Sequence, residues 1–280
     1  MALSDAIRAQ INRPEGAEMV VVNVRNEEAF DPTNHVLPRG TLFLLTEGLV
    51  AVETRQGRFV AGPRSIGWMP PGAPHAVQSY GPTAGFGAFL RPDLCVGLPA
   101  HPANFQATAL AVLVLQRAVG WPIDSALAPA QRRLVLVLLD ELRQASAQPL
   151  QLPWPEDERL LAVARALLAN PASPRRLQQW ARFAEMSPRT LSRKFVQETG
   201  MTFARWRQWA RLIQSLEWLA EGQAVKSVSL SLGYSSVSAF IKVFREALGS
   251  TPAAYFQSRA ADAERAGRRD SQVDAIRPAE

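Results

Sequence analysis

The segment SPRTLSRKFVQETGMTFARW (residues 187–206) is matched, forty-nine residues later in the chain, by SVSAFIKVFREALGSTPAAY (residues 236–255). Aligned on their first serines, the two segments carry the same kind of residue at six positions: Leu191 with Phe240, Phe195 with Phe244, Gly200 with Gly249, Thr202 with Thr251, Ala204 with Ala253 and Trp206 with Tyr255. Repetition at a fixed spacing predicts that one structural unit is present twice.

Each copy carries the signals of a short helix followed by a stop. Ser187 is expected to be an N-cap with Pro188 at the first helical position, and Gly200 is expected to end that helix. Thr202 then caps a long helix that reaches about residue 221. Other helices are expected at 156–168, 175–183, 224–232 and 236–248, with one extra residue in the second turn. The C-terminal part is therefore predicted to be all-α, with two pairs of short helices joined by a long one.

Two short helices joined by a tight turn bury their crossing point and present the second helix outward. The residues expected at the two crossings are Leu177, Ala181, Leu191 and Phe195 in the first pair, and Val225, Ser229, Phe240 and Phe244 in the second. This leaves Arg189, Ser192 and Arg193 on the outer face of the first presented helix, with Lys194 beside them. Two arginines at i and i+4 suit the DNA major groove, because a guanidinium pairs with guanine O6 and N7.

The second presented helix has a different outer face. Its outward positions are Val237, Ser238, Ala239 and Lys242, which offer apolar, hydroxyl and phosphate contacts but no bidentate arginine. We therefore expect the first helix to contribute more base readout and the second more positioning on the DNA.

Charge is concentrated in the same part of the chain. Residues 1–150 hold 12 Lys and Arg against 12 Asp and Glu, whereas residues 175–259 hold 13 basic and 5 acidic residues. This excess favours a polyanionic partner, although chance surface charge can give the same excess and an outward arginine usually meets only water. The repeat shifts the balance toward DNA, because two outward helices on one rigid helix can reach successive major grooves about 34 Å apart.

The remaining composition is typical of a cytoplasmic globular protein. The chain has 280 residues with 47% hydrophobic content, enough for two domains with their own cores. Its apolar runs are too short to span a membrane and its first sixteen residues lack a signal-peptide core, so no membrane partner is expected. Cys95 is the single cysteine, which excludes an intrachain disulfide and favours a reducing compartment.

Residues 19–90 show period-two strand patterns separated by turn residues. The expected strands are MVVVNV, TLFLL, LVAVET, RFVA, SIGWM, HAVQ and FGAFL, with turns that include Glu47-Gly48. Many short strands close together predict an antiparallel barrel or sandwich. Helices are expected after it at 104–119 and 128–147. The second carries a stripe of Leu134, Leu138 and Leu142 that packs on the barrel or on a second copy of the chain.

The proline-rich stretch QPLQLPWP (residues 148–155) predicts a domain boundary. The expected organisation is an N-terminal domain at 1–150, a helical domain at 151–258 and a disordered tail at 259–280. The predicted fold class is α+β and multidomain, with an antiparallel β-barrel followed by an all-α tandem helix-turn-helix part.

The stretches LQQWARFAEMSPRTLSRKFVQETGMTFARW, RLIQSLEWLAEG and VKSVSLSLGYSSVSAFIKVFREALGSTPAAYF resemble the AraC/XylS family of transcription regulators over about 80 residues. The resemblance implies two helix-turn-helix units bridged by a long helix, with recognition helices at 188–198 and 236–248. Three positions depart from the family pattern. Glu185 stands where many members have a turn glycine, Ser229 replaces the usual alanine, and Phe256 stands where an arginine is frequent.

The N-terminal strands resemble a cupin, the sensing domain often found before this DNA-binding module, and PPGAPH (residues 70–75) matches its second motif. In metal-binding cupins the first motif supplies His, His and Glu, but the matching places here hold His35, Leu37 and Thr41. Leucine cannot donate a lone pair, so no metal and no cofactor are expected. The barrel is expected instead to hold an unidentified small-molecule effector, with these candidate lining residues: His35, Thr41, Trp68 and His75.

The sequence thus predicts a regulator, not an enzyme, that binds promoter DNA and responds to an effector as an activator or a repressor. RNA polymerase and a second copy of the chain are further candidate partners. Two other classes stay open at this point. One is a cupin metalloenzyme with a basic helical appendage, and the other is a helical protein-interaction module.

Overall fold

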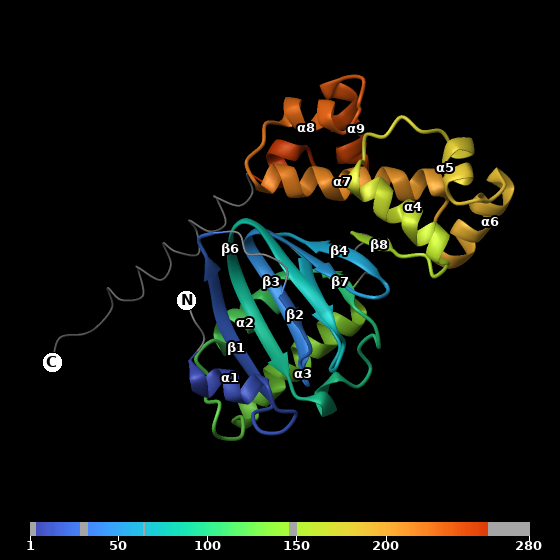
Figure 1. Cartoon of the computed structure of the whole chain (residues 1–280). Coiled ribbons are helices and arrows are strands. Elements are labelled where there is room, and N and C mark those ends of the chain that lie inside the picture. Colours follow the sequence, from blue (N-terminus) through green and yellow to red (C-terminus); the bar gives the residue numbers. More distant parts are fainter. Residues whose placement is uncertain (1–3, 29–32, 64, 146–149, 257–280) are drawn as a thin grey trace.

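The computed structural model describes residues 4–28, 33–63, 65–145 and 150–256. Strands dominate up to Pro153 and helices follow it, and we call these parts the sheet region and the helical region (Figure 1). This confirms the predicted α+β class, with an N-terminal antiparallel sheet followed by helices. The expected disordered tail at 259–280 lies outside the described residues.

The sheet region contains eight strands and three α-helices among the described residues. The strands are β1 (Met19–Asn26), β2 (Thr33–His35), β3 (Gly40–Glu53), β4 (Gly57–Ala61), β5 (Ser65–Met69), β6 (His75–Leu90), β7 (Ala103–Gln106) and β8 (Gln151–Pro153). The helices are α1 (Asp5–Ile11), α2 (Ala109–Ala118) and α3 (Pro129–Gln144), with a 3-10 turn, η1, at Pro92–Cys95.

The helical region contains the helices α4 (Glu158–Ala169), α5 (Leu177–Phe183), α6 (Pro188–Thr199), α7 (Phe203–Ala220), α8 (Val225–Ser231) and α9 (Val237–Leu248), and residues 252–256 are also helical. Helix α7 lies across one end of the sheet, with α5 and α6 near one of its ends and α8 and α9 toward the other (Figure 1). Each helix expected in this region is present within two residues of its predicted limits.

All strand pairs are antiparallel, and β3 and β6 form the centre of the sheet. Strands β1 and β2 pair with β6, β4 and β5 pair with β3, β7 pairs with β5, and β8 pairs with β4. In the described part of the chain β1, β2, β7 and β8 therefore have one neighbour each. The strands of the described ranges do not close into the barrel expected from the sequence, and they form an open sheet instead.

The two central strands are longer than predicted. The predicted turn at Glu47-Gly48 is instead an irregularity inside β3, where the register against β6 shifts between Leu45 and Leu49. Gly48 has a φ of 84°, and a Cβ atom there would lie 2.4 Å from the Pro82 carbonyl oxygen. Only glycine fits this close approach, and Pro82 lies where the ladder is interrupted and its missing N–H is not needed.

The helix expected at 104–119 is wrong in its first part. Residues 103–106 form β7, in which Phe105 pairs with Ile66 of β5, and α2 begins only after Thr108 caps it. The stripe on α3 is internal. Leu138 and Leu142 are buried in a core shared with α2 and the sheet. Packing against the sheet, one of the two expected roles of this stripe, is therefore the one observed.

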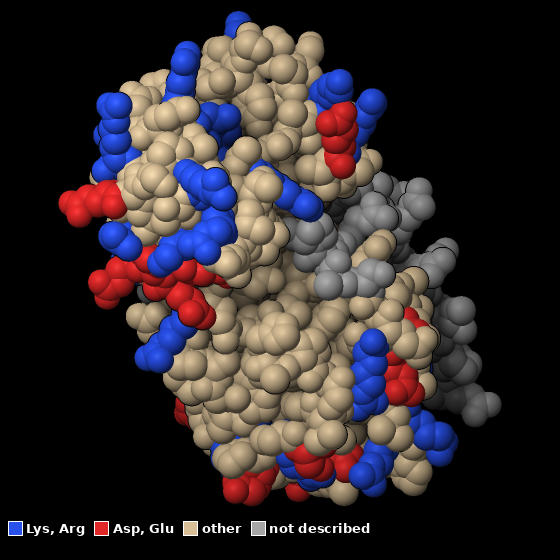
Figure 2. Space-filling view, turned by 90° about the vertical axis from the view of Figure 1, so that its right-hand side faces the viewer, with Lys and Arg blue, Asp and Glu red and all other residues tan. Residues whose placement is uncertain are grey.

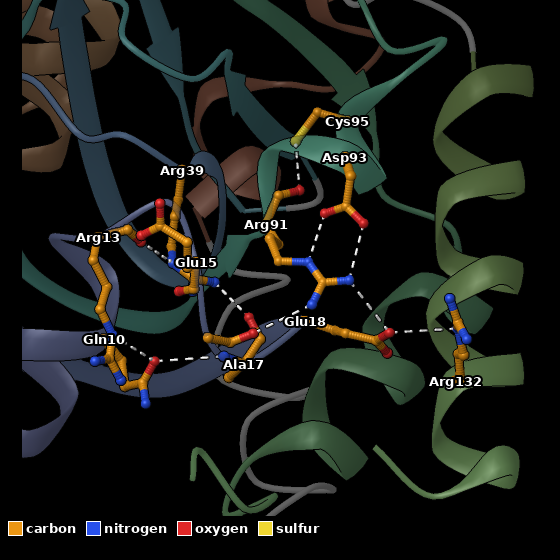
Figure 3. Close-up of polar contacts among 11 residues, drawn as sticks. Gln10, Arg13, Glu15, Ala17, Glu18, Arg39, Arg91, Asp93, Cys95 and Arg132 are labelled. Carbon is orange, nitrogen blue, oxygen red and sulfur yellow. Dashed lines mark hydrogen bonds and ion pairs between the residues drawn. The ribbon is translucent and has the colours of Figure 1, made fainter. Parts of the chain in front are cut away.

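A buried arginine fixes the segment between α1 and β1 (Figure 3). Arg39 is 0% exposed, and its guanidinium donates hydrogen bonds to the carbonyl oxygens of Arg13, Glu15 and Ala17. Burial lowers the pKa of Arg39 below its ordinary value, because the charged form has lost water. These three bonds compensate for that loss and hold the chain against the sheet.

Among the described residues no helix is both long and apolar enough to cross a lipid bilayer.

Candidate functional site

The two pairs of short helices pack as the repeat predicts. Leu191 and Phe195 of α6 are fully buried, and Phe240 and Phe244 occupy the same places in α9. The ring of Phe195 meets Trp206 of α7 edge-on at a centroid distance of 5.6 Å, which fixes α6 against the long helix. In both pairs the second helix is thus held through its inner face, and its outer face is left available.

The presented helices begin and end in the same way. The hydroxyl oxygens of Ser187 and Ser236 each accept a backbone N–H three residues later, at 3.1 Å. Gly200 and Gly249 end the helices in the left-handed conformation, with φ values of 69° and 76°. These caps set where each helix starts, and so they set which residues face outward.

The turns before the presented helices also correspond. The N–H of Met186 donates to the Ala181 carbonyl oxygen at 2.9 Å, and the N–H of Tyr234 donates to that of Ser229 at 3.1 Å. The residue before each donor has a positive φ, which is 52° at Glu185 and 76° at Gly233. Glu185 therefore adopts the conformation expected of the family's turn glycine, at a cost of about 1 kcal/mol.

The outer face of α6 carries cations without ionic partners. Arg189 and Arg193 are exposed, Ser192 is half-buried, and no carboxylate of the described chain forms an ion pair with either arginine. Figure 2 shows Lys and Arg side chains over the helical region on the side where α5 and α6 lie. Guanidinium groups placed in this way on a capped helix can donate hydrogen bonds to phosphate or base acceptors.

Lys194 has a different position from its neighbours. Its ammonium lies 2.6 Å from the Asp157 carboxylate, which also caps the start of α4. The Lys194 ammonium is the main cause that lowers the pKa of Asp157 to about 2. A DNA contact by Lys194 stays a prediction, and in this structure the residue joins α6 to α4.

Of the four outward positions that the sequence predicts on α9, two are exposed and two are half-buried. Ser238 and Lys242 are exposed, whereas Val237 and Ala239 are half-buried. The Lys242 side chain is 75% exposed, and its ammonium lies 4.0 Å from the Glu246 carboxylate, so the two form only a weak exposed ion pair. This helix therefore offers an exposed cation and a hydroxyl.

Comparison with known proteins assigns the family. The family described as "Helix-turn-helix domain" matches residues 180–258. The HTH-type transcriptional regulator NimR of Escherichia coli (strain K12) is 30% identical over 241 residues, which is 86% of this chain and 88% of NimR. The chain belongs to the AraC-type helix-turn-helix transcriptional regulators. This AraC-type regulator is thus a DNA-binding transcription regulator, as the sequence predicts.

Other similarities of this AraC-type regulator are shorter or more distant. The HTH-type transcriptional regulator RipA of Corynebacterium diphtheriae is 34% identical over 113 residues, which is 40% of this chain and 33% of RipA. A solved structure of ToxT from Vibrio cholerae aligns with a TM-score of 0.37 at 10% identity and covers 85% of this chain and 98% of ToxT.

A cleft of about 980 Å³ lies between the sheet region and the start of the helical region. His35 of β2 and His75 of β6 line it, and their rings meet edge-on at a centroid distance of 4.4 Å. His75 Nδ1 lies 2.8 Å from the Ala73 carbonyl oxygen, and burial lowers the pKa of His75. Trp154 adds an indole, Arg55 and Arg165 add two guanidinium groups, and Glu53 and Glu156 add two carboxylates to the lining.

The predicted effector residues are therefore only partly brought together. His35 and His75 share the cleft because β2 pairs with the first residues of β6. Thr41 and Trp68 lie elsewhere, since both belong to the part of the sheet where β3 pairs with β5. Trp68 is 1% exposed and donates its indole N–H to the Pro99 carbonyl oxygen at 2.8 Å, so it is a core residue.

Arg165 and Trp154 were missed because they come from the helical region and the segment before it. A single strand or helix pattern carries no signal for a cleft formed by two such distant parts. Within the described ranges, no group of three or more His, Cys, Asp or Glu side chains is placed to hold a metal ion.

Proposed function

We propose that the protein reads promoter DNA with two helix-turn-helix units, α5–α6 and α8–α9, placed in successive major grooves. The observation that carries this proposal is that Arg189 and Arg193 are exposed on α6 and form no ion pair with any described residue, while Leu191 and Phe195 on the inner face are fully buried. The repetition of cap, turn and stop in α8–α9 supports a second unit of the same kind. Helix α6 reads bases, and Ser238 and Lys242 of α9 position the protein on the backbone.

Gel-shift titration against promoter fragments at increasing salt tests this mode of binding. We expect one fragment to bind about 1,000-fold or more tightly than a shuffled duplex of the same composition. The logarithm of the affinity should fall linearly with the logarithm of the salt concentration, by about 0.9 for each phosphate contacted. Equal and weak binding to both duplexes contradicts the proposal.

The cleft is the proposed site for the effector. Two imidazoles, two guanidinium groups, two carboxylates and an indole within one concave surface are able to orient a small polar or aromatic molecule. The location differs from the interior of a barrel, because the walls come from β2, β6, the β3–β4 turn and α4. The domain limits, 1–150 for the N-terminal domain and 151–258 for the helical domain, stay part of this proposal. Strand β8 lies at the start of the second domain and pairs with β4 of the first.

Loss of His75 is expected to abolish the response to a small-molecule effector. Compounds are screened by the rise that they cause in the melting temperature of the wild-type protein. A compound present at one hundred times its Kd stabilises the folded state by about 2.7 kcal/mol. The His75→Ala variant should show no rise with the compound found. His101 is exposed and outside the cleft, so His101→Ala should respond like wild type. An unchanged response in His75→Ala contradicts the assignment.

RNA polymerase and a second copy of the chain stay predicted partners. The leucine stripe on α3 is not available for a contact between copies, because Leu138 and Leu142 face the sheet. The apolar side chains exposed on the outward surfaces of α2 and α3 include Leu113 and Leu136, which are 60% and 46% exposed. We place the predicted contact between copies there.

A further inference from the structure

The β3–β4 turn connects the cleft directly to α7. We use this term for residues 53–58, which include the last residue of β3 and the first two of β4. Glu53, Thr54 and Arg55 line the cleft. Three residues after Arg55, the Arg58 guanidinium lies 2.6 Å from the Glu217 carboxylate of α7. The same guanidinium nitrogen also donates to the hydroxyl oxygen of Tyr80 on β6. One short turn therefore contacts both the proposed effector site and the helix between the two helix pairs.

The Arg58–Glu217 pair is enclosed. The side chain of Glu217 is 3% exposed and that of Arg58 is 18% exposed. The second carboxylate oxygen of Glu217 accepts a hydrogen bond from the Gln214 amide at 2.9 Å, so both oxygens have partners. Burial raises the pKa of Glu217 and Arg58 opposes that rise. A buried pair with satisfied oxygens adds little net stability, but it penalises any other arrangement of the two elements.

Hydrogen bonds fix the residues of the turn to one another and to the segment before α4. The Thr54 N–H donates to the Gly57 carbonyl oxygen at 2.9 Å, and the Trp154 N–H donates to that of Gln56 at 2.9 Å. Strand β4 then pairs with β8. The residues between Arg55 and Arg58 are therefore held to each other and to the segment before α4, and this is the connection that a coupling between the cleft and Arg58 requires.

Other contacts hold the helical region against the sheet on both sides of this pair. Trp206, near the start of α7, donates its indole N–H to the Pro153 carbonyl oxygen at 2.8 Å. Near the end of α7, a Cβ atom at Gly81 would lie 2.7 Å from the Ala220 carbonyl oxygen. The sheet residues Leu49 and Val60 belong to the same buried core as α7. Helix α7 thus contacts the sheet region along its length, and Arg58–Glu217 is its charged contact there.

We propose that Arg58 and Glu217 are positioning residues that couple the cleft to α7, and through α7 to the relative placement of α6 and α9. This inference rests on the proposed effector cleft and on the proposed two-unit mode of DNA binding. By linkage, a coupling from cleft to DNA surface also runs in the opposite direction. DNA bound at the helical region therefore alters the β3–β4 turn, although no residue of that turn contacts the DNA.

Amide hydrogen exchange of residues 53–58 tests the coupling in the full-length chain. The probe is the duplex that binds most tightly in the gel-shift titration, added at saturation. In wild type, we expect the duplex to slow exchange in the turn about 5-fold or more, which is the lower end of typical coupling between sites. In the double variant Arg58→Met/Glu217→Leu, this slowing should disappear.

The double variant separates coupling from folding. Each single substitution leaves an unpaired buried charge, and each is expected to lower the melting temperature by about 10 °C. The double variant replaces both partners by apolar side chains, so its melting temperature should return to within about 3 °C of wild type. Asp140→Ala removes an exposed ion pair on α3 and serves as the control, which should keep the full response in the turn.

The outcomes are distinct. Slowing of exchange in wild type and in Asp140→Ala, with its loss in the double variant, supports the proposal. The coupling is overturned if the duplex binds wild type and leaves exchange in the turn unchanged, or if the double variant responds like wild type. Failure of the proposed mode of DNA binding appears separately, as equal affinity for specific and shuffled duplexes.

Discussion

Replacing Arg39 with alanine is expected to lower the free energy of unfolding by about 3–5 kcal/mol. The guanidinium is completely buried, and it donates to the carbonyl oxygens of Arg13, Glu15 and Ala17. Alanine removes these donors and leaves carbonyl groups in a place that water reaches poorly. Urea denaturation followed by circular dichroism measures the loss as a lower midpoint with an unchanged slope.

Arg132 provides the matched control for this measurement. It lies in the same neighbourhood (Figure 3), but its side chain is 58% exposed and its nearest carboxylate contact, to Glu18, is 3.5 Å long. Arg132→Ala should therefore change the stability by about 1 kcal/mol or less. Equal losses in the two variants would show that burial of Arg39 has no special role in holding the segment before β1.

Arg189→Ala and Arg193→Ala are each expected to weaken binding to the specific duplex by about 1–3 kcal/mol, or about 5- to 150-fold in Kd. Each variant should lose discrimination at one base position, because a guanidinium that pairs with one guanine reports on that guanine only. Fluorescence anisotropy against a panel of single-base variants of the duplex measures both quantities. The melting temperature should not change, since both side chains are exposed.

Lys242→Ala is the control for the two arginine variants. Because Lys242 is a proposed phosphate contact, its loss should weaken binding to all duplexes equally. It should also reduce the slope of log affinity against log salt concentration by about 1. A uniform loss for Arg189→Ala and Arg193→Ala, without any change in base preference, would contradict the assignment of base readout to α6. Full retention of affinity would instead favour the alternative of a helical protein-interaction module.

Local chemistry made the helical region predictable. A serine hydroxyl that caps a helix and a glycine that ends it act within a few residues. The roles of Ser187, Ser236, Gly200 and Gly249 can therefore be predicted from the sequence alone. The period of the apolar residues then indicates which face is buried. For this reason the crossing point at Phe195 and the outward position of Arg193 follow from the sequence.

The pairing of strands that lie far apart in the chain was harder to predict from the sequence. A glycine such as Gly48 indicates a turn or an irregular strand equally well, and the choice depends on Pro82 in a strand 34 positions away. The prediction of a closed barrel was wrong for the same reason, since closure depends on which edge strands pair with each other. The cleft was harder still to predict, because Arg165 lines the same cleft as His75 only through the packing of α4 beside the sheet.

The two faces of α6 share no residues. Leu191 and Phe195 do the packing, whereas Arg189 and Arg193 contribute nothing to the buried core. Under the proposed mode of binding, selection for a stable protein and selection for a given operator therefore act on different codons. A duplicated gene could acquire a new set of target promoters through a few outward substitutions, while its folding would be inherited unchanged.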